Sequence, residues 1–486
     1  MFSGVARSGR YPTRMALTRI FRAAGVALVN VLAATALAGC RQTEASQVAR
    51  APLTPATMRK DLSAMRADFL ERDRSYSPGA RAEAEKRIAR LAEAADTVGR
   101  AYFEVEIARI VALADNGHTG GGAAQRSSRL NHVPIRLVPF GEDFYVLQTD
   151  SANADVLGAR LLAIDGRPIA ALRNAARSLT GGTIAWRDRA VPFVFESPEQ
   201  MHAIGMAADS GAATYRFEFS DGRDTERRLK ADPPDPSVTR TSVKRVMYPE
   251  LAAGDANRWR TLGTVARAPW ALLDPANPFR WRDAPELDGV VIELRQTVDS
   301  PGHSIGDFLD EVERMLREKH PHNIVLDLRM NGGGNLNTAR DFAQALPSLA
   351  SGRVFALTSP YTFSAAISTL GYLKQAAPDR VTIVGESVGD RLMFWAEGKG
   401  ATLPNSGILI GLATERHDYL TGCKPYKDCH SNVVRHPISV PSLQPEIAAS
   451  WTIGAYTAGL DPAIEAVVEA VGKQPPSSVA RDRAKR

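Results

Sequence analysis

Strand and helix alternate regularly over the second half of the chain, and this alternation limits the fold more than any other feature. Short runs of branched apolar residues have the length and composition of buried strands: 290–294, 324–328, 354–357 and 381–384. Apolar residues recur at helical spacing over 305–316, and a second helix is expected from Ser364 to about 377. Strands joined through helices run parallel, because tight turns join only antiparallel neighbours. The sequence therefore predicts an α/β core on a largely parallel sheet.

The preceding segment, 133–231, changes to the two-residue period of strands. Asp-Gly pairs at 165–166 and 221–222 follow apolar runs and are typical of tight hairpin turns. The run 157–169 is similar to the strand and turn of a PDZ domain, a module that binds an extended C-terminus by adding it to a sheet edge. We expect a PDZ-like domain over 133–231, with an unrelated β-rich insert as the alternative.

The N-terminal region divides into a leader, a tether and a helical domain. Residues 1–39 contain five Arg, no Lys, Asp or Glu, and an apolar stretch, the composition of a secretory signal peptide. The Leu-Ala-Gly-Cys ending at Cys40 resembles the lipobox of bacterial lipoproteins, whose Cys is acylated and becomes the new N-terminus; a plain signal peptide that ends near a Cys is the alternative. Residues 40–56 are predicted to be a polar tether and 57–125 a helical domain.

The leader also explains the charge. Without its five arginines the net charge falls from +6 to +1, so we expect no nucleic-acid partner. The lipobox predicts a protein anchored to the membrane by lipid, at the periplasmic face of the cell envelope. Arg41, in place of Asp after the Cys, favours the outer membrane.

The remaining cysteines, Cys423 and Cys429, lie close together in a segment rich in turn-forming residues. In an oxidising compartment two such cysteines form a disulfide. His430 and His436 follow and raise a zinc site as the alternative, but the spacing matches no common zinc-finger pattern. We expect the disulfide, and no metal.

Three segments of the predicted core carry residues that chemistry could use. A buried strand at 326–328 breaks into the glycines 332–334, which let backbone N–H groups approach a reacting oxygen. Ser364 follows a strand and opens a helix, where the helix dipole favours negative charge, although a Ser in that place is most often a helix cap. A Val-Gly-Glu segment, 384–386, ends the next strand.

In this order the three segments resemble the S41 family of serine peptidases, the tail-specific and tricorn-like enzymes. The family pattern is Asp-Leu-Arg-x-Asn-Gly-Gly-Gly, then Thr-x-Ser-Ala-Ala, then Val-Gly-Glu, and the match spans about 286–475. The order of a helical domain, a PDZ-like domain and a catalytic domain over 240–475 also agrees with the family.

The resemblance implies a crotonase/ClpP-like core and hydrolysis of peptide bonds without a metal or other cofactor. Ser364 would be the nucleophile, and the N–H groups of Ala365 and of Gly332 or Gly333 would hold the oxyanion. It also implies protein or peptide substrates, in some members selected by their C-terminal tails.

The expected catalytic base differs from that of the best-known branch of the family. Ser–Lys members carry a Lys just after Val-Gly-Glu, where this chain has Asp390 and Arg391, and Arg does not deprotonate in proteins. The tricorn-like branch uses a His upstream of the core, and the sequence Asp-Asn-Gly-His-Thr around His118 fits that position. We expect His118 to be the base, with Lys374 or Lys399 as competitors. The acid partner of His118 stays open between three residues: Glu386, Glu415 and Asp418.

Two further functions stay open. A catalytically idle protein of the same fold could bind peptides or lipids, because the missing Lys and the unassigned acid leave the site incomplete. Acyl-CoA chemistry is a third interpretation of a crotonase-like core, but export disfavours it because CoA is cytosolic. The sequence as a whole favours an exported, lipid-anchored serine peptidase.

Overall fold

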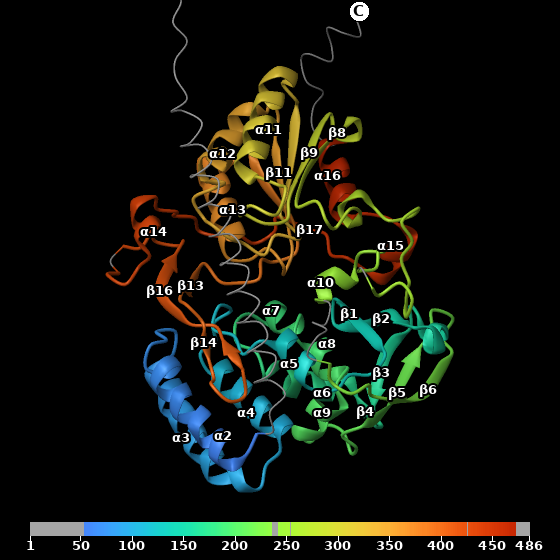
Figure 1. The fold of residues 1–486 in the computed structure, drawn as a ribbon. Coiled ribbons are helices and arrows are strands. Elements are labelled where there is room, and N and C mark those ends of the chain that lie inside the picture. The colour runs from blue at the N-terminus through green and yellow to red at the C-terminus, as the bar shows by residue number, and fades with distance from the viewer. Residues whose placement is uncertain (1–52, 236–241, 253, 425, 473–486) are drawn as a thin grey trace, which may run out of the picture. The chain divides into compact units, whose positions relative to one another are not determined.

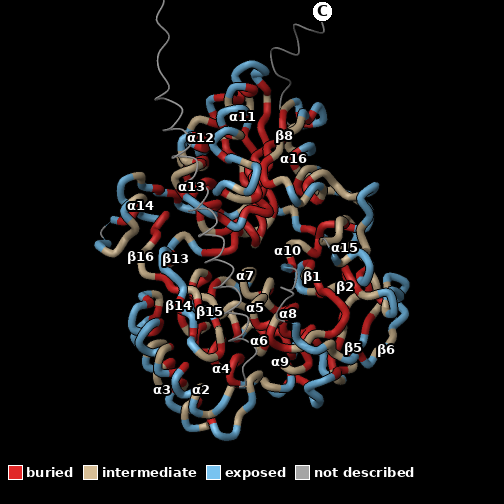
Figure 2. The backbone as a smooth tube through the Cα atoms, viewed as in Figure 1, coloured by how far each residue is buried: buried red, intermediate tan, exposed pale blue. Residues whose placement is uncertain are grey.

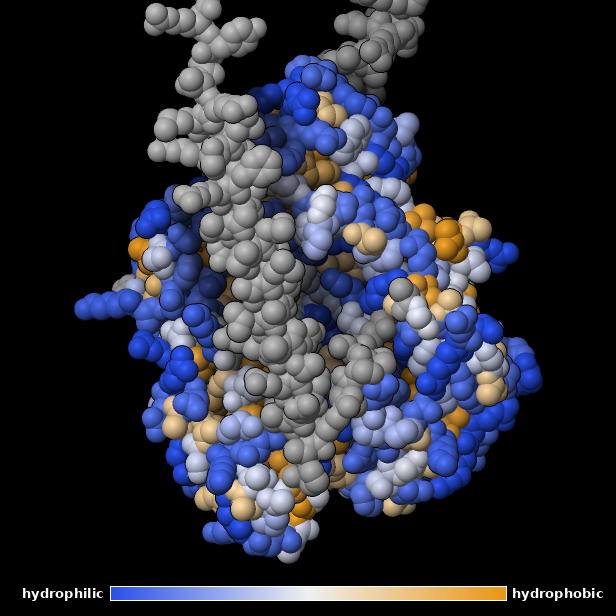
Figure 3. Space-filling view, viewed as in Figure 1, coloured by the Kyte–Doolittle hydropathy of each residue, from blue (hydrophilic) through white to orange (hydrophobic). Residues whose placement is uncertain are grey.

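The computed structural model describes residues 53–472, apart from 236–241, 253 and 425 (Figure 1). The predicted signal peptide, Cys40 and most of the tether lie outside the described residues. Within them, no helix combines the length and apolar character needed to cross a membrane. Where grey atoms do not cover it, the face drawn in Figure 3 is mostly hydrophilic, with hydrophobic residues in small separate patches.

Helices form the N-terminal part, as predicted. Thr54 and Ser77 cap the first two α-helices, each with Pro in the first helical turn, which is a favoured arrangement. The helices are α2 (Pro55–Ala64), η1 (Met65–Leu70), α3 (Pro78–Glu93), η2 (Ala94–Asp96), α4 (Arg100–Ala112) and α5 (Ala123–Arg129).

A hairpin from the far end of the chain completes the core of these helices. Leu403, Ile408, Ile410 and Leu412 are buried against the apolar faces of α2 to α4. The Asp61 carboxylate accepts hydrogen bonds from the backbone N–H groups of Asn405 and Ser406, at 2.8 and 2.7 Å. The strands of this region are β13 (Met393–Glu397), β14 (Ala401–Thr402), β15 (Leu409–Ile410) and β16 (Ala413–Asp418), paired β13 with β16 and β14 with β15.

The middle of the chain is an antiparallel sheet of order β1-β2-β3-β5-β6, with β4 paired to β3 and β7 to β2. Both Asp-Gly pairs form the predicted hairpin turns, and Asp165 and Gly166 have positive φ, as a tight turn between twisted strands requires. The strands are β1 (Ile135–Phe140), β2 (Asp143–Asp150), β3 (Arg160–Ile164), β4 (Arg167–Pro168), β5 (Ala212–Glu218), β6 (Asp224–Lys230) and β7 (Trp259–Thr261).

Helices lie between β4 and β5 and contact the α/β core. They are α6 (Ile169–Arg177), α7 (Ile184–Asp188), α8 (Val191–Phe195) and α9 (Pro198–Ala203), while the short helix η3 (Ser151–Val156) lies between β2 and β3. A hydrogen bond from Thr183 Oγ1 to the Gly389 carbonyl, at 3.0 Å, joins the start of α7 to the core. No local pattern in the sequence indicates this contact between distant segments.

The C-terminal half has the predicted α/β core. Six strands lie in the order β17-β12-β11-β10-β9-β8, all parallel except β8, which is antiparallel to β9. Their bounds are β8 (Phe279–Ala284), β9 (Gly289–Leu294), β10 (Asn323–Asp327), β11 (Val354–Thr358), β12 (Val381–Gly385) and β17 (Ile447–Ala448). The predicted α/β fold class is therefore confirmed.

Helices cover both faces of this sheet, which explains why its strands are apolar throughout (Figures 1 and 2). Alternate residues such as Leu326 and Ala356 pack with α11 (Ile305–Lys319) and α13 (Ala365–Ala376), whereas Val325 and Phe355 pack with α16 (Pro462–Gly472). The other helices of this half are α10 (Val243–Val246), η4 (Trp270–Leu272), η5 (Pro285–Leu287), α12 (Arg340–Ala345), η6 (Leu346–Leu349), α14 (Ser431–Arg435) and α15 (Ile453–Ala458).

Candidate active site

Ser364 lies on a sharp turn between β11 and α13. Its φ of 55° and ψ of −125° lie in a region where residues with a Cβ are sterically strained. Phe363 and Ala365 on either side are buried, while Ser364 is partly exposed. A strained strand-to-helix turn of this kind is one way in which folds present a nucleophilic hydroxyl at a helix N-terminus.

Ser364 occupies the N-cap position of α13 without acting as a cap. Its side chain accepts no hydrogen bond from the helix. Every other Ser or Thr at the N-cap of a described α-helix does accept one: Thr54, Ser77, Thr183, Ser197, Ser242, Ser304 and Thr452. The ordinary structural role of a Ser at this position therefore does not account for Ser364.

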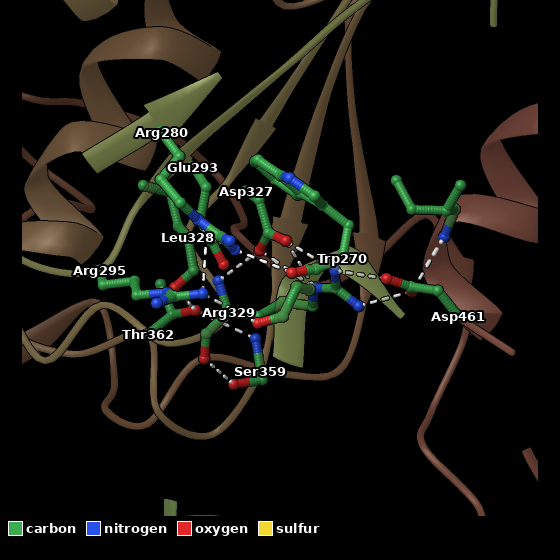
Figure 4. A network of polar contacts seen from close by, with 12 residues as sticks. Trp270, Arg280, Glu293, Arg295, Asp327, Leu328, Arg329, Ser359, Thr362 and Asp461 are labelled. Carbon is green, nitrogen blue, oxygen red and sulfur yellow. Dashed lines mark hydrogen bonds and ion pairs between the residues drawn. The ribbon is translucent and has the colours of Figure 1, made fainter. Parts of the chain in front are cut away.

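The loop before Ser364 is fixed to the Asp-Leu-Arg segment by side-chain hydrogen bonds (Figure 4). Thr362 Oγ1 donates to the Leu328 carbonyl at 2.9 Å, and Ser359 Oγ donates to the Arg329 carbonyl at 2.5 Å. The Phe363 N–H donates to the Asn331 carbonyl at 3.0 Å. These bonds set the position of Ser364 against the glycines that follow Asn331.

Arg329 holds that segment in place from the other side. Its guanidinium lies between two carboxylates, with Nη2 2.6 Å from Asp327 Oδ2 and Nη1 2.7 Å from Asp461 Oδ1. Burial alone would lower the pKa of Arg329, but Asp327 and Asp461 raise it above the ordinary value. Arg329 is therefore a buried cation whose two partners join the start of α16 to the end of β10.

The glycine loop touches Ser364 directly. A Cβ on Gly333 would lie 2.6 Å from the Ser364 Cβ and 3.0 Å from the Ala365 nitrogen, and the φ of Gly333 is +99°, so only glycine fits. The Gly333 N–H donates to Asn331 Oδ1 at 2.9 Å. Within the described backbone, the N–H groups of Gly332 and Ala365 have no hydrogen-bond partner. Gly332 and Ala365 thus offer free donors beside Ser364, whereas the Gly333 donor is occupied.

His118 lies next to this turn, with its imidazole between two phenylalanines. The ring centroid is 4.3 Å from that of Phe363, the residue before Ser364, and 5.0 Å from that of Phe394. Trp186 of α7 stacks on the other face of Phe363 at 3.7 Å. In the part of the chain that the structure describes, neither ring nitrogen of His118 has a hydrogen-bond partner, so no hydrogen bond joins His118 to Ser364.

The carboxylate nearest to His118 belongs to Asp390. Asp390 Oδ2 lies 3.4 Å from His118 Nδ1, and the Asp390 side chain is fully buried. Gly117 makes this approach possible, because a Cβ there would lie 2.9 Å from Asp390 Oδ2. Sequence reasoning placed Asp390 at the position of the missing Lys and did not consider it as the acid. That position, just after Val-Gly-Glu, was the signal that could have indicated it.

The three acids considered from sequence lie elsewhere. Asp418 accepts hydrogen bonds from the backbone N–H groups of Leu420 and Thr421 and so shapes a turn. Glu415 lies on β16 opposite Ala396. Burial raises the pKa of Glu386, which is hydrogen-bonded to Ser450. Among the described residues, none of the three forms an ion pair with His118.

Two lysines, Lys374 and Lys399, are the competing bases considered from sequence. Lys374 Nζ donates to the Val381 carbonyl at 2.6 Å and pairs with Glu446 near the far end of α13, and Lys399 is exposed. A third lysine, Lys244, lies much closer to the glycine loop and was missed from sequence. Its Nζ donates to the Met330 carbonyl at 2.8 Å, and burial lowers its pKa to about 8.

Cys423 and Cys429 are joined as a disulfide, with their Cα atoms 6.2 Å apart. Both sulfurs are therefore engaged, and neither is a thiolate ligand. In the described ranges, no group of three or more His, Cys, Asp or Glu side chains is arranged to hold a metal ion.

Solved structures with this architecture include mature CPAF. That chain is 13% identical, and the match covers 86% of this protein and 96% of CPAF with a TM-score of 0.50. A point mutant of CPAF is 12% identical, with 87% and 99% covered and a TM-score of 0.53. At this identity the likeness concerns the fold alone, which this chain shares with CPAF over nearly the whole of both chains.

A photosystem II D1 C-terminal processing protease also matches, with 14% identity and 86% and 98% covered, but its TM-score of 0.36 is too low to carry an argument. No protein-family model and no curated protein sequence matches this chain.

Proposed function

We propose that this protein is a serine peptidase in which Ser364 is the nucleophile, His118 the general base and Asp390 the residue that orients His118. The observation that carries the proposal is the turn at Ser364. Its hydroxyl is held on a strained backbone, it does not cap the helix that it begins, and it packs against a glycine loop with a free N–H. Strained backbone of this kind is concentrated at functional sites.

Each group has a role in acyl transfer. Ser364 Oγ attacks the peptide carbonyl while His118 removes its proton, and the N–H groups of Ala365 and Gly332 stabilise the oxyanion. His118 then gives the proton to the leaving amine, and water hydrolyses the acyl-enzyme by the same route. Asp390 faces Nδ1 and so favours the tautomer whose Nε2 accepts the proton. His118 must move from its present position to reach Ser364, and such bonds often form only with substrate bound.

The unformed bond between Ser364 and His118 favours a second candidate, a peptide-binding protein of the same fold without activity. Labelling with a fluorophosphonate probe separates the two, because only an activated serine reacts. We expect the parent protein to be labelled at Ser364, and Ser364→Ala not to be labelled. An unlabelled parent that still binds peptides would favour the idle protein.

Hydrolysis of peptide or ester substrates tests the base and its partner. His118→Ala should lower kcat by at least three orders of magnitude, and Asp390→Asn by two to four orders, with Lys399→Ala as a matched surface control. Thermal unfolding checks that each variant is folded. Near-parental activity in His118→Ala would refute the assignment, and loss of kcat in Lys244→Met alone would replace it with a Ser–Lys pair.

We further propose that the protein is exported and anchored by an acylated Cys40 to the periplasmic face of the envelope, on the outer membrane. The support is the lipobox after an Arg-rich, apolar leader. Cys40→Ser should move the protein from the detergent phase to the aqueous phase and change the mass of its N-terminus. An unchanged partition would place the anchor elsewhere.

The β-rich part, 133–231, is proposed to bind C-terminal tails of protein substrates by strand addition. Deleting it also removes Trp186, which stacks on Phe363. A competing C-terminal peptide is therefore a cleaner test than deletion. Such a peptide should inhibit cleavage of a tailed protein but not of a short peptide, and equal inhibition of both would contradict tail selection by this part.

A further inference from the structure

A pocket opens beside the loop that carries His118. Its walls include the backbone of Gly117 and of Gly120 to Gly122, apolar side chains such as Phe193 and Val243, and the ring of Trp186. It encloses about 1210 Å³ including its open mouth, which is enough for several peptide residues. Two cations line it, Arg189 and Lys244, and none of its described lining residues is Asp or Glu.

Neither cation has a charged partner among the described residues. Arg189 Nη1 donates to the Pro360 carbonyl at 3.2 Å, and its Nε has no hydrogen-bond partner. Lys244 Nζ donates to the Met330 carbonyl. The neighbouring Arg187, in contrast, forms an ion pair with Asp115.

The nearby acidic groups do not compensate for these charges. Asp188, next to Arg189 in sequence, is already bound to Arg173 and Arg177. Tyr361 lies under the Arg189 guanidinium, 4.3 Å from its centre, but burial raises the pKa of Tyr361 to about 12, so the phenol is neutral at pH 7.

Burial and mutual repulsion both disfavour the charged forms of these two side chains. Burial lowers the pKa of Arg189 to about 10. Burial lowers that of Lys244 to about 8, with Arg189 and Arg295 adding repulsion. Arg189 and Lys244 are each partly exposed, and two partly buried like charges without an anion are unfavourable, so an anion that enters the pocket would stabilise them.

The pocket adjoins the groups proposed for catalysis. Gly117 in its wall precedes His118, Trp186 stacks on the residue before Ser364, and Met330, which accepts the Lys244 hydrogen bond, lies two residues before Gly332. A ligand held by Arg189 and Lys244 therefore lies beside the substrate of the proposed peptidase.

We infer that this pocket binds a carboxylate of the substrate between Arg189 and Lys244, and that it selects peptides with a negative charge near the bond that is cleaved. The role in cleavage rests on the proposed function, whereas the binding itself does not. The carboxylate has two sources, the C-terminus of a peptide or an Asp or Glu side chain. Both suit a pocket that combines apolar walls with a fork-shaped guanidinium and an ammonium group.

Binding is tested with the full-length Ser364→Ala protein, so that catalysis plays no part. Three fluorescein-labelled alanine-rich peptides serve as probes: one with a free C-terminal carboxylate, one with an amidated C-terminus, and the amidated peptide with one internal Asp. We expect at least one carboxylate peptide to bind about tenfold or more tightly than the neutral one by fluorescence anisotropy. Whichever peptide gains affinity identifies the source of the carboxylate.

Arg189→Gln and Lys244→Gln should each remove most of that preference, and the double variant all of it. Arg267→Gln, at a different pocket, and the exposed Lys399→Gln are matched controls that should keep it. Arg189→Lys, which keeps the charge, should retain part of the preference if Arg189→Gln folds poorly.

Equal affinity for all three peptides would overturn the inference, and so would a preference that survives in the double variant, which would place carboxylate recognition in another part of the chain. A protein that prefers the carboxylate peptide but is not labelled by a fluorophosphonate would contradict the proposed function and leave the pocket assignment standing.

Discussion

Replacing Ser364 with Gly should stabilise the protein while abolishing the proposed peptidase activity. The backbone of Ser364 lies where a Cβ costs about 1–3 kcal/mol, and glycine removes that cost. Glycine also gains freedom in the unfolded chain, which costs about 0.5–1 kcal/mol relative to Ala. The hydroxyl makes no capping bond that would be lost. On balance, the free energy of unfolding should rise by about 1 kcal/mol.

Ser364→Ala keeps the strain and removes a hydroxyl that makes no capping bond, so Ser and Ala should be about equally stable at this position and Gly more stable than either. Ser304 is the matched control, because it caps α11 with an ordinary φ of −84° and accepts a bond from the Asp307 N–H at 3.2 Å. There Ser should be the most stable, Gly slightly less so, and Ala the least.

Calorimetry of the five proteins at one pH measures these orders. In a chain of this size a change of about 1 kcal/mol shifts Tm by roughly 1–2 °C, which replicate scans resolve. If Ser364→Gly is less stable than the parent, as at the control position, then the turn is not strained. The argument that function maintains this backbone would then fail.

Three further perturbations test other parts of the molecule. Replacing Cys423 and Cys429 together with Ser should lower the free energy of unfolding by about 2 kcal/mol, because the disulfide closes only a short loop. Non-reducing peptide mapping of the parent should first find the two cysteines paired, and two free thiols would contradict this. Arg329→Met should lower the free energy of unfolding, measured with denaturant, by about 3–5 kcal/mol, because Asp327 and Asp461 lose their buried partner. A loss under about 1 kcal/mol would mean that water solvates the two carboxylates in place of the guanidinium. Burial lowers the pKa of Lys244 to about 8, so between about pH 8 and 10.5 the unfolded chain binds more protons at this residue than the folded one. Its contribution to stability should therefore rise with pH over that window, and Lys244→Met should stabilise the protein at pH 7 by more than at pH 10; a pH-independent difference would contradict the low pKa.

The strands and helices of the core could be predicted from the sequence because each is recorded in local periodicity. The apolar runs of β9, β10, β11 and β12 differ from their predicted bounds by a residue or so at each end. Both Asp-Gly hairpins formed because that dipeptide accepts the positive φ of the turn. Predictions of this kind succeed when neighbours in sequence contain all the information.

The site could be predicted only in part, because it depends on distant contacts. The sequence placed Ser364 at the start of a helix but could not show that its hydroxyl would leave the helix uncapped. Asp390 reaches His118 from a segment far along the chain, and only Gly117 allows the approach. Trp186 comes from a helix that the β-rich pattern of its region did not indicate.

The same long-range contacts connect the proposed base to the β-rich part of the chain. Asp115, three residues before His118, pairs with Arg187 of α7 at 2.5 Å and with Arg391, next to Asp390, at 2.8 Å. The imidazole of His118 is stacked between Phe363 and Phe394, so its approach to Ser364 must break at least part of this stacking. Asp115 lies on the same loop, and its two ion pairs join that loop to α7 and to the segment of Asp390. The position of the proposed base is therefore tied to two elements that lie far from it in sequence.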